Sequence, residues 1–155
     1  KETVTKNTKK LFLIALKVLC LVGFINTEVS AETVRYKVNN YLTKVEAVPV
    51  PDQEGHMLVV AERRGVVVFE DGSLGTHHGQ LMADLVKGQG SWQSYGQITH
   101  ADGAMAVSKW NGSLVRPEGK KTVLVKGQGE YIKGTGRLEG IKGTLSLEGI
   151  YRIRN

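Results

Sequence analysis

Turn-forming residues interrupt the chain about every ten positions from Glu32 onward, a spacing typical of all-β domains. Between these interruptions, apolar residues alternate with polar ones or run in short blocks, without the period of an amphipathic helix. Short alternating runs bounded by Gly, Pro, Asn and Asp are typical of strands joined by turns. The pattern therefore predicts an all-β domain over residues 32–155.

The same pattern gives the number and order of the strands. Pro49 and Pro51 end the first strand, because proline cannot donate to a central ladder. The dipeptides at 71–72, 102–103 and 111–112 pair Asp or Asn with Gly, which predicts tight turns. About eight strands follow, near 33–47, 56–70, 76–88, 91–100, 104–110, 120–127, 130–134 and 143–154. Hairpins in sequence order predict an antiparallel meander, and long strands favour a small, closed or nearly closed β-barrel.

One hexapeptide, LVKGQG, occurs at 85–90 and again at 124–129, followed one residue later by Trp92 and Tyr131. Each copy is interpreted as the end of a strand, a glycine turn and an aromatic residue that opens the next strand. Similar hairpins need similar turn chemistry, so this interpretation is favoured over a duplicated half-domain.

The N-terminal segment has the pattern of a signal peptide. Four lysines lie within residues 1–10, an apolar run extends from Leu11 to Ile25, and a polar stretch ends at Ala31. This order predicts a signal helix within a peptide over 1–31 that is cleaved to leave residues 32–155 as one domain. An uncleaved anchor or a buried helix are the alternatives, but a membrane span needs about 20 apolar residues, and Lys17 interrupts this shorter run. We therefore expect a secreted or periplasmic domain with no membrane attachment after cleavage.

Cleavage would change the composition in two ways. The net charge of +6 would be halved, because residues 1–31 hold five lysines and two glutamates. The remaining Lys and Arg form no cluster interleaved with aromatic residues, which disfavours nucleic-acid binding. The single cysteine, Cys20, would also be removed, and the domain would rely on its core instead of disulfides.

The glycine-rich segment KGTGRLEGIKGT at 133–144 resembles the strand-turn-strand of the allene oxide cyclase-like β-barrels, a group that includes the dirigent proteins. Their pattern is GGTGxFxGxxG; here Lys133 replaces the first glycine and Leu138 replaces the aromatic residue. The stretches 60–72 and 98–113 resemble secreted bacterial proteins with this barrel. The resemblance implies a barrel whose lumen holds an apolar substrate and steers ring closure or coupling. No catalytic position carries over to this chain.

The histidines do not predict a metal site. His77 and His78 are adjacent, so a regular strand points them to opposite faces. His56 and His100 complete the set of four, and no His-x-His or HExxH spacing is present. We expect neither a metal nor a cofactor.

Glu62 is the most unusual acid, because it follows the apolar run Met57–Ala61. Strand parity places it with Leu58 and Val60, and if that face points inward, a carboxylate lies in or near the lumen. A buried carboxylate needs a partner or a raised pKa, which would suit a polar anchor or a general acid-base group. The hypothesis is that Glu62, with Tyr95 or His100, supplies the polar group of an apolar ligand site. Alternatively, the strand ends near Ala61 and Glu62 is solvated.

Three functions remain open at this point. The first is a secreted small β-barrel that binds a small, mostly apolar ligand in its lumen. The second is an enzyme of the cyclase or isomerase kind that uses the same lumen, and the third is a structural or interaction domain whose barrel is filled by side chains. An open lumen favours the first, convergent polar groups in it favour the second, and a filled lumen favours the third. Homo-oligomerisation is left open, because the sequence offers no clear interface stripe.

Overall fold

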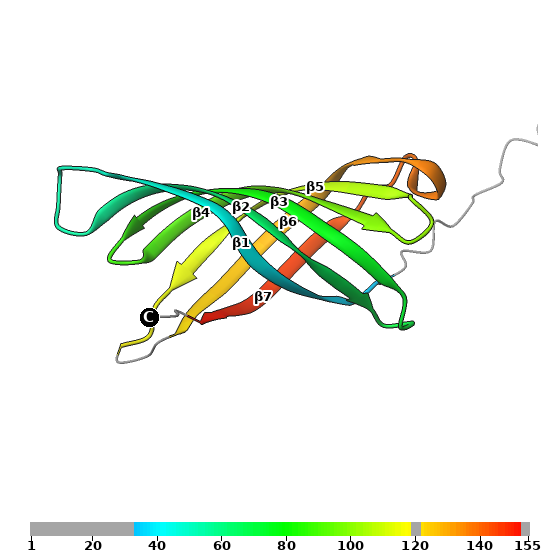
Figure 1. Ribbon diagram of the computed structural model, residues 1–155, viewed down its shortest axis with the longest axis horizontal. Coiled ribbons are helices and arrows are strands. Elements are labelled where there is room, and N and C mark those ends of the chain that lie inside the picture. Colours follow the sequence, from blue (N-terminus) through cyan, green and yellow to red (C-terminus); the bar gives the residue numbers. More distant parts are fainter. Residues whose placement is uncertain (1–32, 119–121, 153–155) are drawn as a thin grey trace, which may run out of the picture. The chain divides into compact units, whose positions relative to one another are not determined.

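The computed structural model describes residues 33–118 and 122–152. This part of the chain forms one antiparallel sheet in which each strand pairs with the next along the chain, as Figure 1 shows. The strands are β1 (Tyr36–Pro49), β2 (His56–Phe69), β3 (Leu74–Val86), β4 (Gln89–His100), β5 (Met105–Val115), β6 (Thr122–Gly134) and β7 (Thr144–Arg152). The predicted all-β meander is confirmed, with seven strands where about eight were expected.

The predicted leader over 1–31, with its signal helix, lies outside the described residues. Among the residues that are described, the helical structure is η1 (Gly136–Leu138), a single 3₁₀ turn before β7. No helix in this part of the chain is long and apolar enough to cross a membrane.

Two of the three predicted turns are confirmed. At Asp71-Gly72, between β2 and β3, the Asp71 carboxylate accepts a hydrogen bond of 2.9 Å from the backbone N–H of Ser73. At Asp102-Gly103, between β4 and β5, the Asp102 carboxylate accepts one of 3.0 Å from the backbone of Ala104. In both turns the aspartate side chain satisfies a backbone donor that the hairpin leaves free.

The third predicted turn, Asn111-Gly112, is wrong, because both residues lie inside β5. Gly112 pairs with Trp92 on β4 and with Gly127 on β6, and a Cβ at Gly112 would lie 2.7 Å from the Trp92 ring. A Cβ there would also overlap the backbone oxygen of Lys126 on β6, so this glycine permits close packing against β6 and the indole and does not turn the chain.

The two copies of LVKGQG adopt different structures, which explains the missing eighth strand. In the first copy, Lys87 and Gly88 have φ of 52° and 80° and form the two-residue turn between β3 and β4. In the second copy, Gly127 and Gly129 lie within β6, where Cβ atoms would meet the rings of Trp92 and Trp110. The predicted strands 120–127 and 130–134 are therefore one continuous strand.

The sheet coils, and β1 crosses over the strands of the opposite edge in Figure 1. The coiling lets Arg63 of β2 donate a hydrogen bond of 3.2 Å to the Tyr151 hydroxyl of β7. Burial, and after it the nearby Tyr131 phenol of β6, raise the pKa of Tyr36 on β1, so these two strands also approach each other here. Over the described residues, however, β1 pairs with β2 and β7 with β6, and these two edges do not pair with each other. The expected closure of the barrel by backbone hydrogen bonds is therefore not present.

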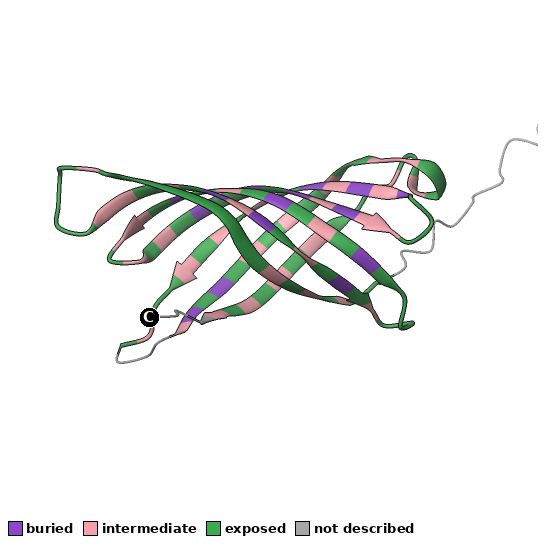
Figure 2. Cartoon of the chain, viewed as in Figure 1, coloured by how far each residue is buried: buried purple, intermediate pink, exposed green. Residues whose placement is uncertain are grey.

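We call the inner face the side of the sheet that carries Ala61, Ala83, Trp92 and Val125, and the outer face the other side. Trp92 is 3% exposed and packs with Ala83 and Val125, and seven partly buried apolar residues surround them. Figure 2 shows buried and exposed residues alternating along the central strands, as expected for a sheet with one buried face. Trp92 is therefore at the centre of the core on this face.

Candidate functional site

Glu62 lies on the outer face of β2. Its parity with Leu58 and Val60 holds, but these two side chains are about half exposed, whereas Ala61 and Arg63 are buried. The condition attached to the Glu62 hypothesis, that this parity faces inward, is therefore not met. The physical reason is that β2 is apolar on both faces, so hydrophobicity alone did not distinguish them.

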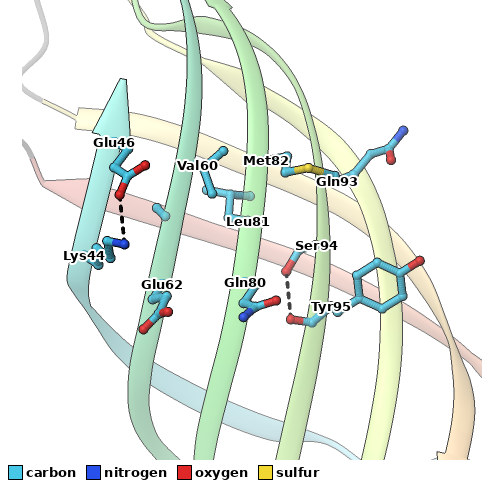
Figure 3. A pocket seen from close by; sticks show the side chains of 11 residues that line it. Lys44, Glu46, Val60, Glu62, Gln80, Leu81, Met82, Gln93, Ser94 and Tyr95 are labelled. Atoms are coloured by element: carbon cyan, nitrogen blue, oxygen red, sulfur yellow. Dashed lines mark hydrogen bonds and ion pairs between the residues drawn. The ribbon is translucent and has the colours of Figure 1, made fainter. Parts of the chain in front are cut away.

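A hollow of about 330 Å³ lies beside Glu62 on the outer face of β1 to β4 (Figure 3). Tyr95 borders the same hollow, because the register places Glu62 opposite Gln80 on β3 and Gln80 opposite Tyr95 on β4. The complete lining consists of Lys44, Glu46, Val60, Ala61, Glu62, Gln80, Leu81, Met82, Gln93, Ser94 and Tyr95. Two of the three predicted site residues thus meet at one concave surface.

The lining of this outer hollow combines charged and apolar groups. Lys44 and Glu46 form an ion pair of 2.8 Å, and their hydrogen bond raises the pKa of Lys44 and lowers that of Glu46. Glu62 is partly buried, and among the described residues it takes part in no ion pair within 4.0 Å. Val60, Met82 and Tyr95 each expose about half of their surface. Lys44 lies opposite Glu62 in the register and is shared by the two carboxylates, so the hollow offers an apolar surface beside charged groups with a net charge of −1.

His100 does not reach this hollow. Its ring stacks on Phe69 with the centroids 4.6 Å apart, and its Nδ1 lies 2.9 Å from Nη2 of Arg137. Arg137 is held in turn by Asp102, with Nε to Oδ2 at 2.6 Å. His100 is therefore part of a packed cluster at the end of β4, and the structure separates it from Glu62 and Tyr95.

A polar belt crosses the inner face and was not predicted from the sequence. Its centre is Arg63, which is 6% exposed and donates to Ser94 Oγ at 2.6 Å and to the Tyr151 hydroxyl at 3.2 Å. His77 lies in the same belt, with its Nδ1 2.8 Å from Asn40 Oδ1. A usable signal was present, since Arg63 has the parity of Ala61 and Val67 on β2.

The belt lowers the pKa of His77 to about 4. Burial of the imidazole is the main cause, and the nearby positive charge of Arg63 adds to it. His77 is therefore neutral at pH 7. His78, by contrast, is exposed, so the predicted placement of these two histidines on opposite faces is confirmed.

His56 forms a separate charged cluster at the start of β2. Its Nδ1 lies 2.5 Å from Asp52 and its Nε2 lies 2.7 Å from Asp84, so both ring nitrogens donate when the ring is protonated. The hydrogen bonds to Asp52 and then Asp84 raise the pKa of His56 above its usual value. Because the carboxylates occupy both nitrogens, the cluster ties the β1–β2 loop to β3.

Within the described residues, no group of three His, Cys, Asp or Glu is placed to hold a metal ion.

Comparisons with family models, curated proteins and solved structures find no match to this chain. The resemblance to allene oxide cyclase-like barrels stays a prediction.

Proposed function

We propose that this domain is a binding module that takes a small, mostly apolar molecule in the outer hollow beside Glu62 and Tyr95. The observation that carries the proposal is the hollow itself, whose volume of about 330 Å³ is that of a small-molecule site. Half-exposed Val60 and Met82 supply apolar surface that a ligand would remove from water. No reaction is assigned to the site.

The charges of the hollow favour one kind of ligand. The Lys44 cation is paired with Glu46 and lies opposite Glu62, which leaves one negative charge in excess. A cationic or hydrogen-bond-donating group on the ligand would pair with Glu62, while an aromatic or aliphatic body would lie against Tyr95 and Met82. We therefore expect apolar amines to bind more tightly than matched alcohols, and alcohols more tightly than matched acids.

This proposal moves the ligand from the lumen to the outer face. The inner face around Trp92 is packed with side chains, which favours an interaction domain over a molecule held at the centre of a barrel. A second candidate function is therefore a protein-interaction domain, favoured by this packing and by the unpaired edges of β1 and β7 in the described part of the sheet. The cyclase or isomerase alternative would use Glu62 as an acid-base group in the same hollow.

We also propose barrel closure, a secreted or periplasmic location and membership of the allene oxide cyclase-like group, each with separate support. Barrel closure is supported by the coiling, which joins Arg63 to Tyr151 by a hydrogen bond and brings Tyr36 near Tyr131 across the inner face. Secretion or a periplasmic location is supported by the basic and apolar pattern of residues 1–31. Membership of the allene oxide cyclase-like group is supported by the glycine pattern at 133–144.

A thermal-shift screen with a matched pair of variants tests the binding proposal. The panel contains lipids, terpenoids and aromatics, with phenethylamine, phenethyl alcohol and phenylacetate as the matched series. A ligand at about 100 times its Kd stabilises the fold by about 2.7 kcal/mol, which raises Tm by several degrees. Val60→Lys should abolish the shift, whereas Val68→Lys, on the same face of β2 but outside the hollow, should keep it. No shift with any compound, or equal shifts in both variants, would contradict the proposal.

A further inference from the structure

Arg63 is a buried cation whose N–H donors are not all used in hydrogen bonds. The guanidinium has five N–H groups, and the structure uses one for Ser94 and one for Tyr151. Its Nε is out of contact with solvent and has no hydrogen-bond partner among the residues that the structure describes. A buried donor that lacks an acceptor destabilises the fold. The Nε–H group of Arg63 therefore still lacks the acceptor that would remove this penalty.

The charge of Arg63 is also unbalanced. Arginine does not lose its proton in proteins, and none of the ion pairs formed among the described residues includes Arg63. The polar groups around it on the inner face are the hydroxyls of Ser94 and Tyr151 and the imidazole of His77, and none of them is a carboxylate. An unpaired buried charge is strongly unfavourable, and an anion beside it would remove that penalty.

Solvent reaches this side of the sheet along β1. Leu42 pairs with Arg63 and Val45 pairs with Ala61, so both side chains lie on the inner face. They are nevertheless 50% and 51% exposed, because β1 does not pair with β7 over the described residues. In Figure 2, β1 is exposed along most of its length. Arg63 itself is 6% exposed, so a small solute reaches its guanidinium only when side chains along this open margin move aside.

We propose that the inner face beside Arg63 binds a small carboxylate. The carboxylate accepts from Nε–H and from the free N–H of the neighbouring amino group, in the two-point geometry that guanidinium and carboxylate groups share. Ser94 and Tyr151 keep their present hydrogen bonds and hold the guanidinium in place. This site is separate from the outer hollow, so either proposal can fail while the other stands.

Nuclear magnetic resonance of the full chain labelled with ¹⁵N-arginine tests this site by titrating the unsubstituted protein. Formate, acetate and chloride are titrated at constant ionic strength while the Nε–H signals are followed, with the Arg63 signal assigned from Arg63→Lys. We expect formate and acetate to shift the Arg63 signal saturably, and chloride to need at least about tenfold more, because it makes a single-point contact. The signal of Arg64, an exposed neighbour, should show no saturation.

Two results would overturn the proposal. The first is an Arg63 signal that does not saturate with either carboxylate, and the second is a chloride midpoint equal to that of acetate. Thermal unfolding gives an independent check with Arg63→Met, which removes the charge and keeps apolar volume. The variant should lose the rise in Tm that acetate gives, while Arg64→Met should keep it. A rise that persists in Arg63→Met would also contradict the site.

Discussion

Arg63 and His77 share the inner face, and the charge of one opposes protonation of the other. Burial and the Arg63 cation lower the pKa of His77 to about 4, whereas two carboxylates raise that of His56. Two histidines of the same chain are thus shifted in opposite directions, one by desolvation and one by hydrogen bonds to carboxylates. Each shift gives a dependence of stability on pH with a definite sign.

His77 should make the domain less stable in acid. The unfolded chain protonates His77 near its usual pKa of 6.5, but the folded chain does so only near 4. The stability contribution is complete above pH 6.5 and is lost as the pH falls toward 4. Between pH 7 and pH 4.5 we expect a loss of about 2 kcal/mol that is absent in His77→Gln. Urea unfolding of both proteins at the two pH values measures it, and equal losses would contradict the assignment.

His56 should behave in the opposite way. Its folded pKa lies above the unfolded value, so its contribution is complete below pH 6.5 and is lost as the pH rises through the folded pKa. In an NMR titration of the histidines, His56 should have the highest pKa and His77 the lowest. Asp84→Asn should lower the His56 value, and Glu54→Gln, a nearby exposed control, should leave it in place. If Asp84→Asn leaves the His56 pKa unchanged, the 2.7 Å contact is not formed in solution.

Strands and turns were predictable where local chemistry decides them. The Asp-Gly turns and the Pro49 end of β1 follow from residues that act within a few positions of one another. LVKGQG shows the limit, because the second copy stays extended under the ring of Trp92, a residue 35 positions earlier than Gly127. Tertiary packing therefore overrides a turn signal that operates in the first copy.

The packing of Trp92 on β6 gives a test at this scale. A Cβ on Gly127 would lie 2.5 Å from the Trp92 ring, so Gly127→Ala should destabilise the domain by about 2 kcal/mol. Gly149→Ala is the matched control on β7, where a Cβ meets nothing within 4 Å, and its effect should stay below about 0.5 kcal/mol. Denaturant unfolding compares the two variants. Equal effects would show that the indole does not occupy the space above Gly127.

At the scale of the whole sheet, the sequence predicted the meander but not how its edges meet. Closure depends on contacts between residues far apart in the chain, such as Arg63 and Tyr151, and no local pattern encodes them. The face of the sheet on which the candidate site lies was not predictable for a related reason. Glu62 and Tyr95 do share a concave surface, but the inner face could be identified only once the packing of Trp92 was known.

The contact of β1 with β6 can be tested by a double-mutant cycle. Tyr36 and Tyr131 lie close together across the inner face, and burial raises the pKa of both phenols. Tyr36→Phe and Tyr131→Phe should be coupled by about 0.5 to 1.5 kcal/mol in unfolding free energy. Tyr41→Phe, at an exposed position of β1, should be additive with Tyr131→Phe. Additivity of the Tyr36 pair would mean that β1 does not meet β6.

The central claim, that a small apolar molecule binds on the outer face of β1 to β4, is tested most directly by the methionine methyl groups. Met82 lines the outer hollow, whereas Met57 and Met105 do not. With ¹³C-methyl methionine in the full chain and phenethylamine as the titrant, the account predicts a saturable shift of the Met82 signal, assigned from Met82→Leu. The signals of Met57 and Met105 should stay in place. A Met82 signal that does not move, or a larger saturable shift at Met105, would contradict the account.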